Sequence, residues 1–257
     1  LKFLLCFEIK YVLSIRGSDI TINIINNKIQ REKVTKALYH ANGIHTISEY
    51  LKNAIIDLDI QVNKITVIPR LLNNINTIKK KNHPNKLHLL TIGRFHWIKG
   101  YSYILEACNK LNKMGLQFQY TICGSNDLSV REPYANEERH LHYLISLYKL
   151  TDKIKLLGFV DQEVLYDQYI MADIYICGSL NEGLNTSIIT ALQFKNKVIA
   201  PNIGGIPDYI SNRKNGLLFK PGESDDLLDC LLKIINKDWK PDYYFPSVYP
   251  NNDEILN

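Results

Sequence analysis

The chain has 257 residues, of which 46% are hydrophobic and 22% charged, with 31 Lys and Arg against 26 Asp and Glu. This composition is ordinary for a globular enzyme, and no segment reaches the ~18 apolar residues of a membrane span. The five cysteines are widely spaced and form no Cys-x-x-Cys pair, so neither a zinc site nor a disulfide framework is indicated. We therefore expect a cytoplasmic protein with buried, reduced thiols.

Positive charge gathers in the first third of the chain. Residues 1–87 hold 14 Lys and Arg against 6 Asp and Glu. Such a basic segment suggests an anionic partner, such as a phospholipid leaflet or a lipid-diphosphate acceptor. A solvated basic face is the alternative, and we prefer it for the three lysines at 79–81, which lie in an Asn-rich segment.

The first part of the chain alternates short apolar runs with helical patterns. Strands are expected at 10–15, 43–48 and 64–69, a turn at 16–19, and helices at 27–39 and 49–58, the second capped by Ser48. The chain begins at Leu1, in what looks like the middle of a domain. We therefore interpret residues 1–72 as the remnant of an amino-terminal domain, followed by a polar linker at 73–86.

From residue 87 onwards, strand and helix patterns alternate strictly. Strands are expected at 87–93, 118–124, 153–159, 173–178, 196–201 and 216–219, and helices near 100–114, 136–149, 161–170, 186–194, 205–210 and 223–236. This alternation predicts a parallel sheet with right-handed crossovers, here over residues 87–237, and leaves 238–257 as a tail. Ligands of such sheets bind at the carboxyl ends of the strands.

Two strand-to-helix junctions carry the chemistry. In TIGRFHWIKG (91–100) an apolar run breaks at Gly93 and is followed by Arg94 and Lys99. In the second junction, an apolar run ends before Glu182 and a helix opens with Asn185 or Thr186 as its cap. A helix N-terminus carries about half a positive charge and unpaired N–H donors. Together with Arg94 and Lys99, this helix N-terminus can hold a diphosphate without a metal. Taken alone, each of the two residues could instead be an ordinary surface cation.

These motifs, with IAPNIGGIPDYI (199–210) and NGLLF (215–219), resemble the carboxy-terminal half of a family 4 glycosyltransferase of the GT-B fold. The resemblance runs in order from about residue 11 to about residue 237. It implies a Rossmann-like domain at 87–237 that binds the donor, and part of a second, acceptor-side Rossmann-like domain at 1–72. It also implies retaining transfer of a sugar from a nucleotide diphosphate to an acceptor hydroxyl, with no metal and no further cofactor.

The resemblance assigns roles to particular residues. Arg94 and Lys99 would hold the donor diphosphate and offset the charge of the leaving group, and Glu182 would meet the sugar hydroxyls. The remaining donor-binding positions are Gly93, Gly124, Phe159 and Val160 around the nucleotide, and Gly183, Leu184, Asn185 and Thr186 at the head of the helix. Strand-end glycines needed only for turns are a nearly equal explanation for Gly124 and its neighbours.

Several positions depart from the family pattern. The second glutamate of its Glu-x7-Glu element is Thr190 here, which could keep one ribose contact at a loss of roughly 1.5–3 kcal/mol. Arg16 replaces a histidine that faces the donor sugar; it could contact sugar or phosphate but not act as a base. Asp208 stands where glutamate is usual and receives little functional weight. Asp57 and Asp59 form an Asp-x-Asp pair, which we interpret as a solvated helix end.

Three functions stay open at this point. The first is a glycosyltransferase of surface polysaccharide or lipid-linked glycan synthesis, with peripheral membrane contact through the basic segment at the inner face of the membrane. The second is a catalytically inactive remnant that binds sugar nucleotides, and the third a nucleotide-sugar 2-epimerase of the same fold. No basic-aromatic module for nucleic acid is present. Donor base, sugar, acceptor and oligomeric state are not specified by the sequence.

Overall fold

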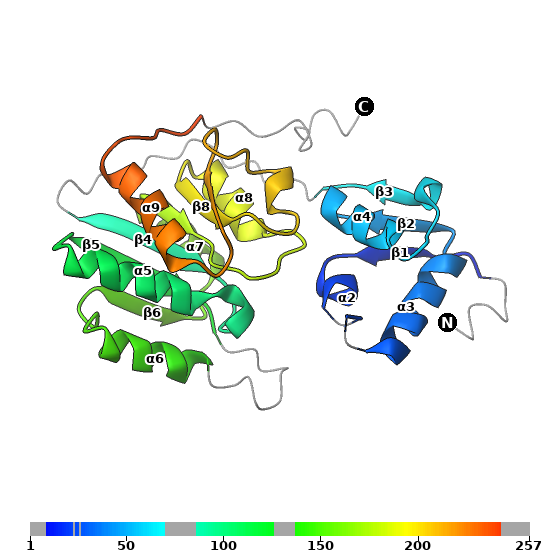
Figure 1. Cartoon of the computed structure of the whole chain (residues 1–257), viewed down its shortest axis with the longest axis horizontal. Helices are drawn as coiled ribbons and strands as arrows, with labels where there is room; N and C mark the ends of the chain where they lie inside the picture. The colour runs from blue at the N-terminus through cyan, green and yellow to red at the C-terminus, as the bar shows by residue number, and fades with distance from the viewer. Residues whose placement is uncertain (1–8, 23, 26, 70–85, 126–136, 243–257) are drawn as a thin grey trace.

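The computed structural model describes residues 9–22, 24–25, 27–69, 86–125 and 137–242, which form two α/β parts, each built on its own sheet (Figure 1). The predicted linker lies outside these residues except for Lys86, as does the tail beyond residue 242. Every pairing between the named strands is parallel. The predicted α/β class with parallel sheets is confirmed.

The amino-terminal part has a three-stranded sheet in the order β1-β2-β3. Its elements are β1 (Val12–Ile15), α2 (Ser18–Thr21), α3 (Lys28–His40), β2 (Gly43–Thr46), α4 (Glu49–Ile56), a 3₁₀ turn (Val62–Lys64) and β3 (Ile65–Val67). Leu38 of α3 and Leu51 of α4 pack with Ile44 of β2 in one core. Of the turn predicted at 16–19, Arg16 and Gly17 lie between β1 and α2, whereas Ser18 already begins α2, because the Gly17 carbonyl accepts the amides of Ile20 and Thr21 and closes a helical turn.

The carboxy-terminal part has a six-stranded sheet in the order β6-β5-β4-β7-β8-β9. The strands are β4 (Leu87–Ile92), β5 (Phe118–Cys123), β6 (Ile154–Gly158), β7 (Ile174–Ile176), β8 (Lys197–Pro201) and β9 (Leu217–Phe219). Strands β5 and β7 are almost wholly buried, as expected for a parallel sheet covered on both faces.

Helices cover both faces of this sheet. Three helices share one core and lie together on the near side in Figure 1: α5 (Tyr101–Lys113), α6 (Glu137–Leu147) and α9 (Ser224–Ile235). The opposite core takes residues from α7 (Gln162–Met171), α8 (Thr186–Gln193) and a 3₁₀ turn, η4 (Ile206–Asp208). The helix predicted at 205–210 is only this turn, because the Asn215 side chain accepts from the Ser211 amide and donates to the Tyr209 carbonyl, two groups that a longer helix would use. No helix of the described residues is long and apolar enough to cross a membrane.

The strand order reverses in the middle of this sheet. The chain enters at β4, adds β5 and β6 on one side, and then returns to place β7, β8 and β9 on the other side. In open α/β sheets, ligands bind in the crevice outside the carboxyl ends of the strands at such a reversal. Lys99 follows β4 and Glu182 follows β7, so the two predicted motifs flank the reversal.

The loops after β4 and β7 approach each other through glycines. A 3₁₀ turn, η2 (Trp97–Lys99), ends at Gly100, which has a left-handed φ of 62°. A Cβ on Gly100 would overlap the carbonyl of Gly178, and a Cβ on Gly178 would lie 2.8 Å from the Gly100 oxygen. This contact between backbones sets Lys99 beside the loop that carries Glu182.

Replacing Gly100 by alanine should therefore cost more than about 3 kcal/mol, because the methyl group meets backbone that cannot rotate away. Gly115→Ala is the matched control, since Gly115 also has a positive φ (77°) but no atom within 4 Å of an added Cβ. The control should cost only about 1–2 kcal/mol for the left-handed backbone. Thermal unfolding followed by circular dichroism measures both, and equal losses would show that the close approach does not matter.

Candidate functional site

Three strand ends lie in a row on one side of the reversal. The amide of Gly93, after β4, donates to the carbonyl of Cys123 at 3.0 Å, and the amide of Gly124, after β5, donates to the carbonyl of Gly158 at 2.8 Å. A Cβ on Gly124 would overlap the Gly93 carbonyl, so a glycine is needed there for packing. Both glycines line a cavity of about 220 Å³ together with Ile92, Arg94, Cys123, Ser125, Gly158, Phe159, Val160 and Leu165.

This cavity combines an apolar wall with two features that suit a nucleoside. Phe159 is 84% exposed, and its ring offers a flat face on which a base can stack. Arg94 is exposed at the same cavity and brings a permanent positive charge. The predicted residues Gly93, Arg94, Gly124, Phe159 and Val160 are thus brought together around one opening.

Next to the cavity, Lys99 and Glu182 form an ion pair across the reversal. The Lys99 Nζ lies 2.5 Å from the Glu182 Oε1, and the two side chains are 20% and 10% exposed. The same Oε1 accepts from Ser179 Oγ at 2.7 Å and from Asn185 Nδ2 at 3.0 Å. Within the described residues every hydrogen bond of Glu182 side-chain oxygens goes to Oε1, so Oε2 is left to accept from a ligand hydroxyl.

Asn185 links this carboxylate to helix α8. Its Oδ1 accepts from the amides of Ser187 and Ile188 at 3.1 and 3.2 Å, so it is the N-cap, as one of the two predicted caps. Its Nδ2 donates to Glu182 and to the Cys177 Sγ. The side chain therefore ties the start of α8, the ion pair and the end of β7 into one unit.

The free amides expected at the head of α8 differ from those that the structure provides. The cap occupies the amides of Ser187 and Ile188, and the amide of Asn185 itself donates to the Tyr209 hydroxyl at 3.1 Å. At the head of α8, the amides of Gly183, Leu184 and Thr186 donate to no group of the described residues. The donors available to an anion therefore lie in the loop before α8 and at its first residue.

Thr190 and Arg16 were predicted to face the donor, and in the structure they make different kinds of contact. The Thr190 hydroxyl donates to the Thr186 carbonyl at 3.0 Å, so it is engaged within its own helix. Arg16 belongs to the amino-terminal part, yet its carbonyl and the neighbouring Gly17 pack on Gly183, where an added Cβ would lie 2.9 Å from each. The Arg16 turn thereby reaches the loop that carries Glu182.

Two contributors to the site were not predicted from sequence. Ser179 is buried and holds Glu182, and Tyr209 is buried and holds the Asn185 amide. The Ser-x-x-Glu spacing of Ser179 and Glu182 is that of a capping box and could have indicated the pair. Tyr209 lies 24 residues from Asn185, and no local pattern connects them.

Among the residues that the structure describes, neither a reactive thiol nor a cluster of metal ligands lies at the site. Burial raises the pKa of Cys177 to about 11, with the Glu182 charge acting in the same direction, so this thiol stays protonated and unreactive near neutral pH. In the described ranges no three His, Cys, Asp or Glu side chains gather as metal ligands. Asp57 and Asp59 are exposed at the end of α4, where a solvated helix end was expected.

A second cavity, of about 270 Å³, lies toward the opposite end of the strands. It is lined by Lys86, His88, Leu89, Leu90, Gln119, Thr121, Lys155, Leu157, Gln168, Met171 and Ala172. Lys86 and Lys155 make it basic, but none of the helix starts or strand-end glycines described above opens into it. The carboxyl-end site is therefore the better candidate, although the second cavity is the larger.

The ion pair should couple the two motifs energetically. Lys99→Met leaves the Glu182 carboxylate nearly buried with neutral donors only, and should cost about 1–3 kcal/mol. Lys99→Met combined with Glu182→Gln should recover at least about 1 kcal/mol, because the uncompensated charge is gone. Urea denaturation of the single and double variants measures this coupling.

The control for this cycle is an exposed ion pair on the same part of the chain. Lys220 and Glu223 lie 3.1 Å apart with side chains 70% and 51% exposed. Lys220→Met should change stability by less than about 0.5 kcal/mol. Additive effects of the Lys99 and Glu182 substitutions would contradict a coupled pair.

Comparison with protein families identifies one match. The model described as "Glycosyl transferases group 1" matches residues 74–244, well over half of the chain. The amylovoran biosynthesis glycosyltransferase AmsK of Erwinia amylovora is 30% identical over 154 residues, which cover 58% of this chain and 36% of AmsK. The gpi3 subunit of phosphatidylinositol N-acetylglucosaminyltransferase of Schizosaccharomyces pombe is 23% identical over 215 residues, covering 83% of this chain and 44% of that subunit.

Solved structures share the fold. Anabaena Alr3699/HepE, determined in complex with UDP and glucose, superposes with a TM-score of 0.77 at 18% identity and covers 91% of this chain and 64% of its own. Sucrose-phosphate synthase of Thermosynechococcus elongatus gives 0.78 at 18% identity, covering 91% of this chain and 61% of its own. The chain spans between about a third and a half of the curated relatives it matches.

Proposed function

The chain belongs to the glycosyl transferases group 1 family, and from that membership we propose that it carries the donor-binding half of a retaining glycosyltransferase. The donor is a nucleoside-diphosphate sugar and the acceptor a hydroxyl group. The observation that supports this best is the Lys99–Glu182 pair at the strand-order reversal, beside a cavity suited to a base. The cavity suits the nucleoside of such a donor, the cation suits its diphosphate, and the carboxylate, with one oxygen available, suits its sugar.

In this proposal, each part of the donor has its own partners. The base enters the cavity beside Phe159, and the diphosphate lies between Arg94, Lys99 and the unpaired amides of the 183–186 loop. The sugar then reaches Glu182, whose Oε2 can accept from one of its hydroxyls. Binding the sugar through a fixed carboxylate holds the anomeric carbon in place for attack.

The transfer breaks the bond between the anomeric carbon and the phosphate oxygen, and the electron pair stays on the diphosphate. The acceptor oxygen takes its place on the same face of the sugar, and its proton leaves with the diphosphate. Arg94 and Lys99 stabilise the negative charge that develops on the leaving group, which is electrostatic catalysis by fixed cations. These charges do for the diphosphate what a divalent cation does elsewhere, so we propose that no metal is required.

For the acceptor we propose a growing surface glycan or a lipid-linked sugar at the inner face of a membrane. AmsK is named for amylovoran biosynthesis and gpi3 for transfer to phosphatidylinositol, and both are relatives of part of this chain. The exposed basic residues of α3, Lys28, Arg31, Lys33 and Lys36, support peripheral contact with an anionic leaflet.

A remnant that binds nucleotide sugars without transferring them is the second candidate. Thr190 favours it, because its hydroxyl donates to the Thr186 carbonyl and can offer a ribose hydroxyl only a neutral acceptor, where the family has a charged carboxylate. Release of nucleoside diphosphate from a nucleotide sugar separates the two functions. The enzyme should release it faster when polysaccharide or lipid-linked acceptors are present, and the remnant should not.

Nucleotide binding should depend on two cations and not on a metal. Titration calorimetry with UDP, GDP and ADP should give at least one measurable affinity, unchanged by EDTA. Arg94→Ala or Lys99→Ala should weaken that affinity by roughly 10- to 100-fold, the loss of a charged hydrogen bond. Lys113→Ala is the control, since this exposed lysine ends α5 away from the site, and it should stay within about twofold of wild type. Binding that EDTA abolishes and Arg94→Ala leaves unchanged would contradict the proposal.

A further inference from the structure

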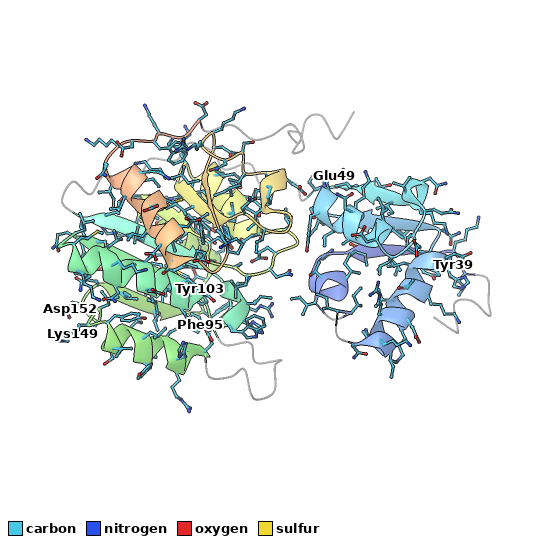
Figure 2. The ribbon with its side chains drawn as sticks, in the orientation of Figure 1. Tyr39, Glu49, Phe95, Tyr103, Lys149 and Asp152 are labelled. Atoms are coloured by element: carbon cyan, nitrogen blue, oxygen red, sulfur yellow. The ribbon has the colours of Figure 1, made fainter. Side chains whose placement is uncertain are left out.

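Asp208 of the carboxy-terminal part contacts the first turn of a helix in the amino-terminal part. Its Oδ2 accepts from the amide of Glu49 at 2.9 Å and lies 3.4 Å from the amide of Tyr50. These are the first two residues of α4, and Figure 2 shows Glu49 on the side of α4 that faces the larger part. Ser48 caps the next amide, that of Leu51, at 3.3 Å. One helix start is thus capped jointly by a side chain from each part.

The loop that leads to Asp208 also supports Glu182. The Gly205 amide donates to the Glu182 carbonyl at 3.1 Å. A Cβ on Gly204 would overlap that carbonyl, and a Cβ on Gly205 would overlap the carbonyl of Gly183. On its other side Gly205 faces Ser48, where an added Cβ would lie 3.1 Å from the serine Cβ and Oγ. Residues 204–208 are therefore held between the start of α4 and the Glu182 loop.

A second set of contacts joins the two parts on the other side of the same loop. The Arg16 carbonyl and Gly17 lie against Gly183, and the Thr21 Oγ1 donates to the Asn181 Oδ1 at 3.2 Å. Residues 181–183 are consequently bracketed by the 16–21 segment on one side and by the 204–208 loop on the other. A movement of the amino-terminal part would change both contacts of this loop.

We propose that Asp208 is a positioning residue: by binding the start of α4, it holds the amino-terminal part in the orientation that seats the Arg16 turn on the Glu182 loop. The proposal rests on the function proposed above for the site itself. Asp208 touches no reacting group and acts through α4 and through the loop that it terminates.

The electrostatics of Asp208 fit a contact that fixes the orientation of α4 more than it stabilises the fold. Asp208 is partly buried, and burial raises its pKa, whereas the amides of Tyr50 and Glu49 lower it and the Glu49 carboxylate raises it further. The net increase means that the surroundings do not fully offset the desolvation of the carboxylate. Such a contact can specify one arrangement of the two parts and still release it.

Hydrogen exchange with mass spectrometry on the full chain tests the proposal without reference to activity. Asp208→Ala should speed exchange roughly fivefold or more in residues 49–52 and also in 16–21 and 181–184, because the bracket around the loop opens. Asp208→Asn keeps one acceptor oxygen and should show a smaller change with the same pattern. Ser48→Ala, which removes only the local cap, should affect residues 49–52 alone.

Asp161→Ala is the matched control. Asp161 caps α7 within the carboxy-terminal part, accepting from the Val164 amide at 2.9 Å, so its loss should leave 16–21 and 181–184 unchanged. An effect of Asp208→Ala confined to 49–52, as in Ser48→Ala, would overturn the proposal, as would no effect at all. If Asp208→Ala does not fold, Asp208→Asn decides by the same criteria.

Activity supplies an independent readout. Where the chain transfers sugar, Asp208→Asn should lower kcat by more than about fivefold and weaken nucleotide affinity by less than that, because Arg94, Lys99 and Phe159 lie outside the loosened loop. Weaker nucleotide binding with unchanged kcat would overturn the positioning role. A wild-type chain without transfer would count against the proposed function, while the exchange pattern would still decide the role of Asp208.

Discussion

The ion pair between Lys99 and Glu182 is the interaction on which the site depends. It joins the loops that follow β4 and β7, the two neighbouring strands between which the strand order reverses. A carboxylate that is only 10% exposed requires donors, and Glu182 finds them in Lys99, Ser179 and Asn185. Because Asn185 also caps α8, fixing this one carboxylate fixes the loop, the cation and the start of the helix together.

Glycines set how closely these loops can pack. Gly100 faces the Gly178 carbonyl, Gly124 faces that of Gly93, and Gly205 faces that of Gly183, each with no room for a Cβ. Contacts between backbones have fewer ways to adjust than contacts between side chains, so the positions of Lys99 and Glu182 follow from the main chain. This rigidity suits the proposed binding of a diphosphate and a sugar at a fixed separation.

Local sequence patterns predicted the fold well and the site in part. The strands from β4 to β8 were expected within about two residues of their ends, because apolar runs and strand-end glycines are local signals. Arg94, Lys99 and Glu182 could be placed at one edge of the sheet because the carboxyl ends of parallel strands lie together there, and their roles stay predictions. The helix predicted at 205–210 was wrong beyond Asp208, because the side chain of Asn215 takes the Ser211 amide and the Tyr209 carbonyl out of a helical pattern.

Contacts between residues far apart in the sequence could not be predicted from local patterns. Asn185 caps the amides of Ser187 and Ile188, which a bare helix start would leave free, and only the three-dimensional structure shows which amides remain. Asp208 is 159 residues from Glu49, in a different part of the fold, and nothing in its own segment indicates the contact. The sequence therefore indicated the sheet edge at which the candidate site lies. Which amides at the head of α8 are engaged, and how the two parts of the fold contact each other, could be seen only in the structure.

A crystal structure of the chain with UDP bound would test the central claim most directly. The account predicts the base against Phe159 and the diphosphate within hydrogen-bond distance of Lys99 and of an amide among residues 183–186. Nucleotide bound at the opposite end of the strands, in the basic cavity of Lys86 and Lys155, would contradict it.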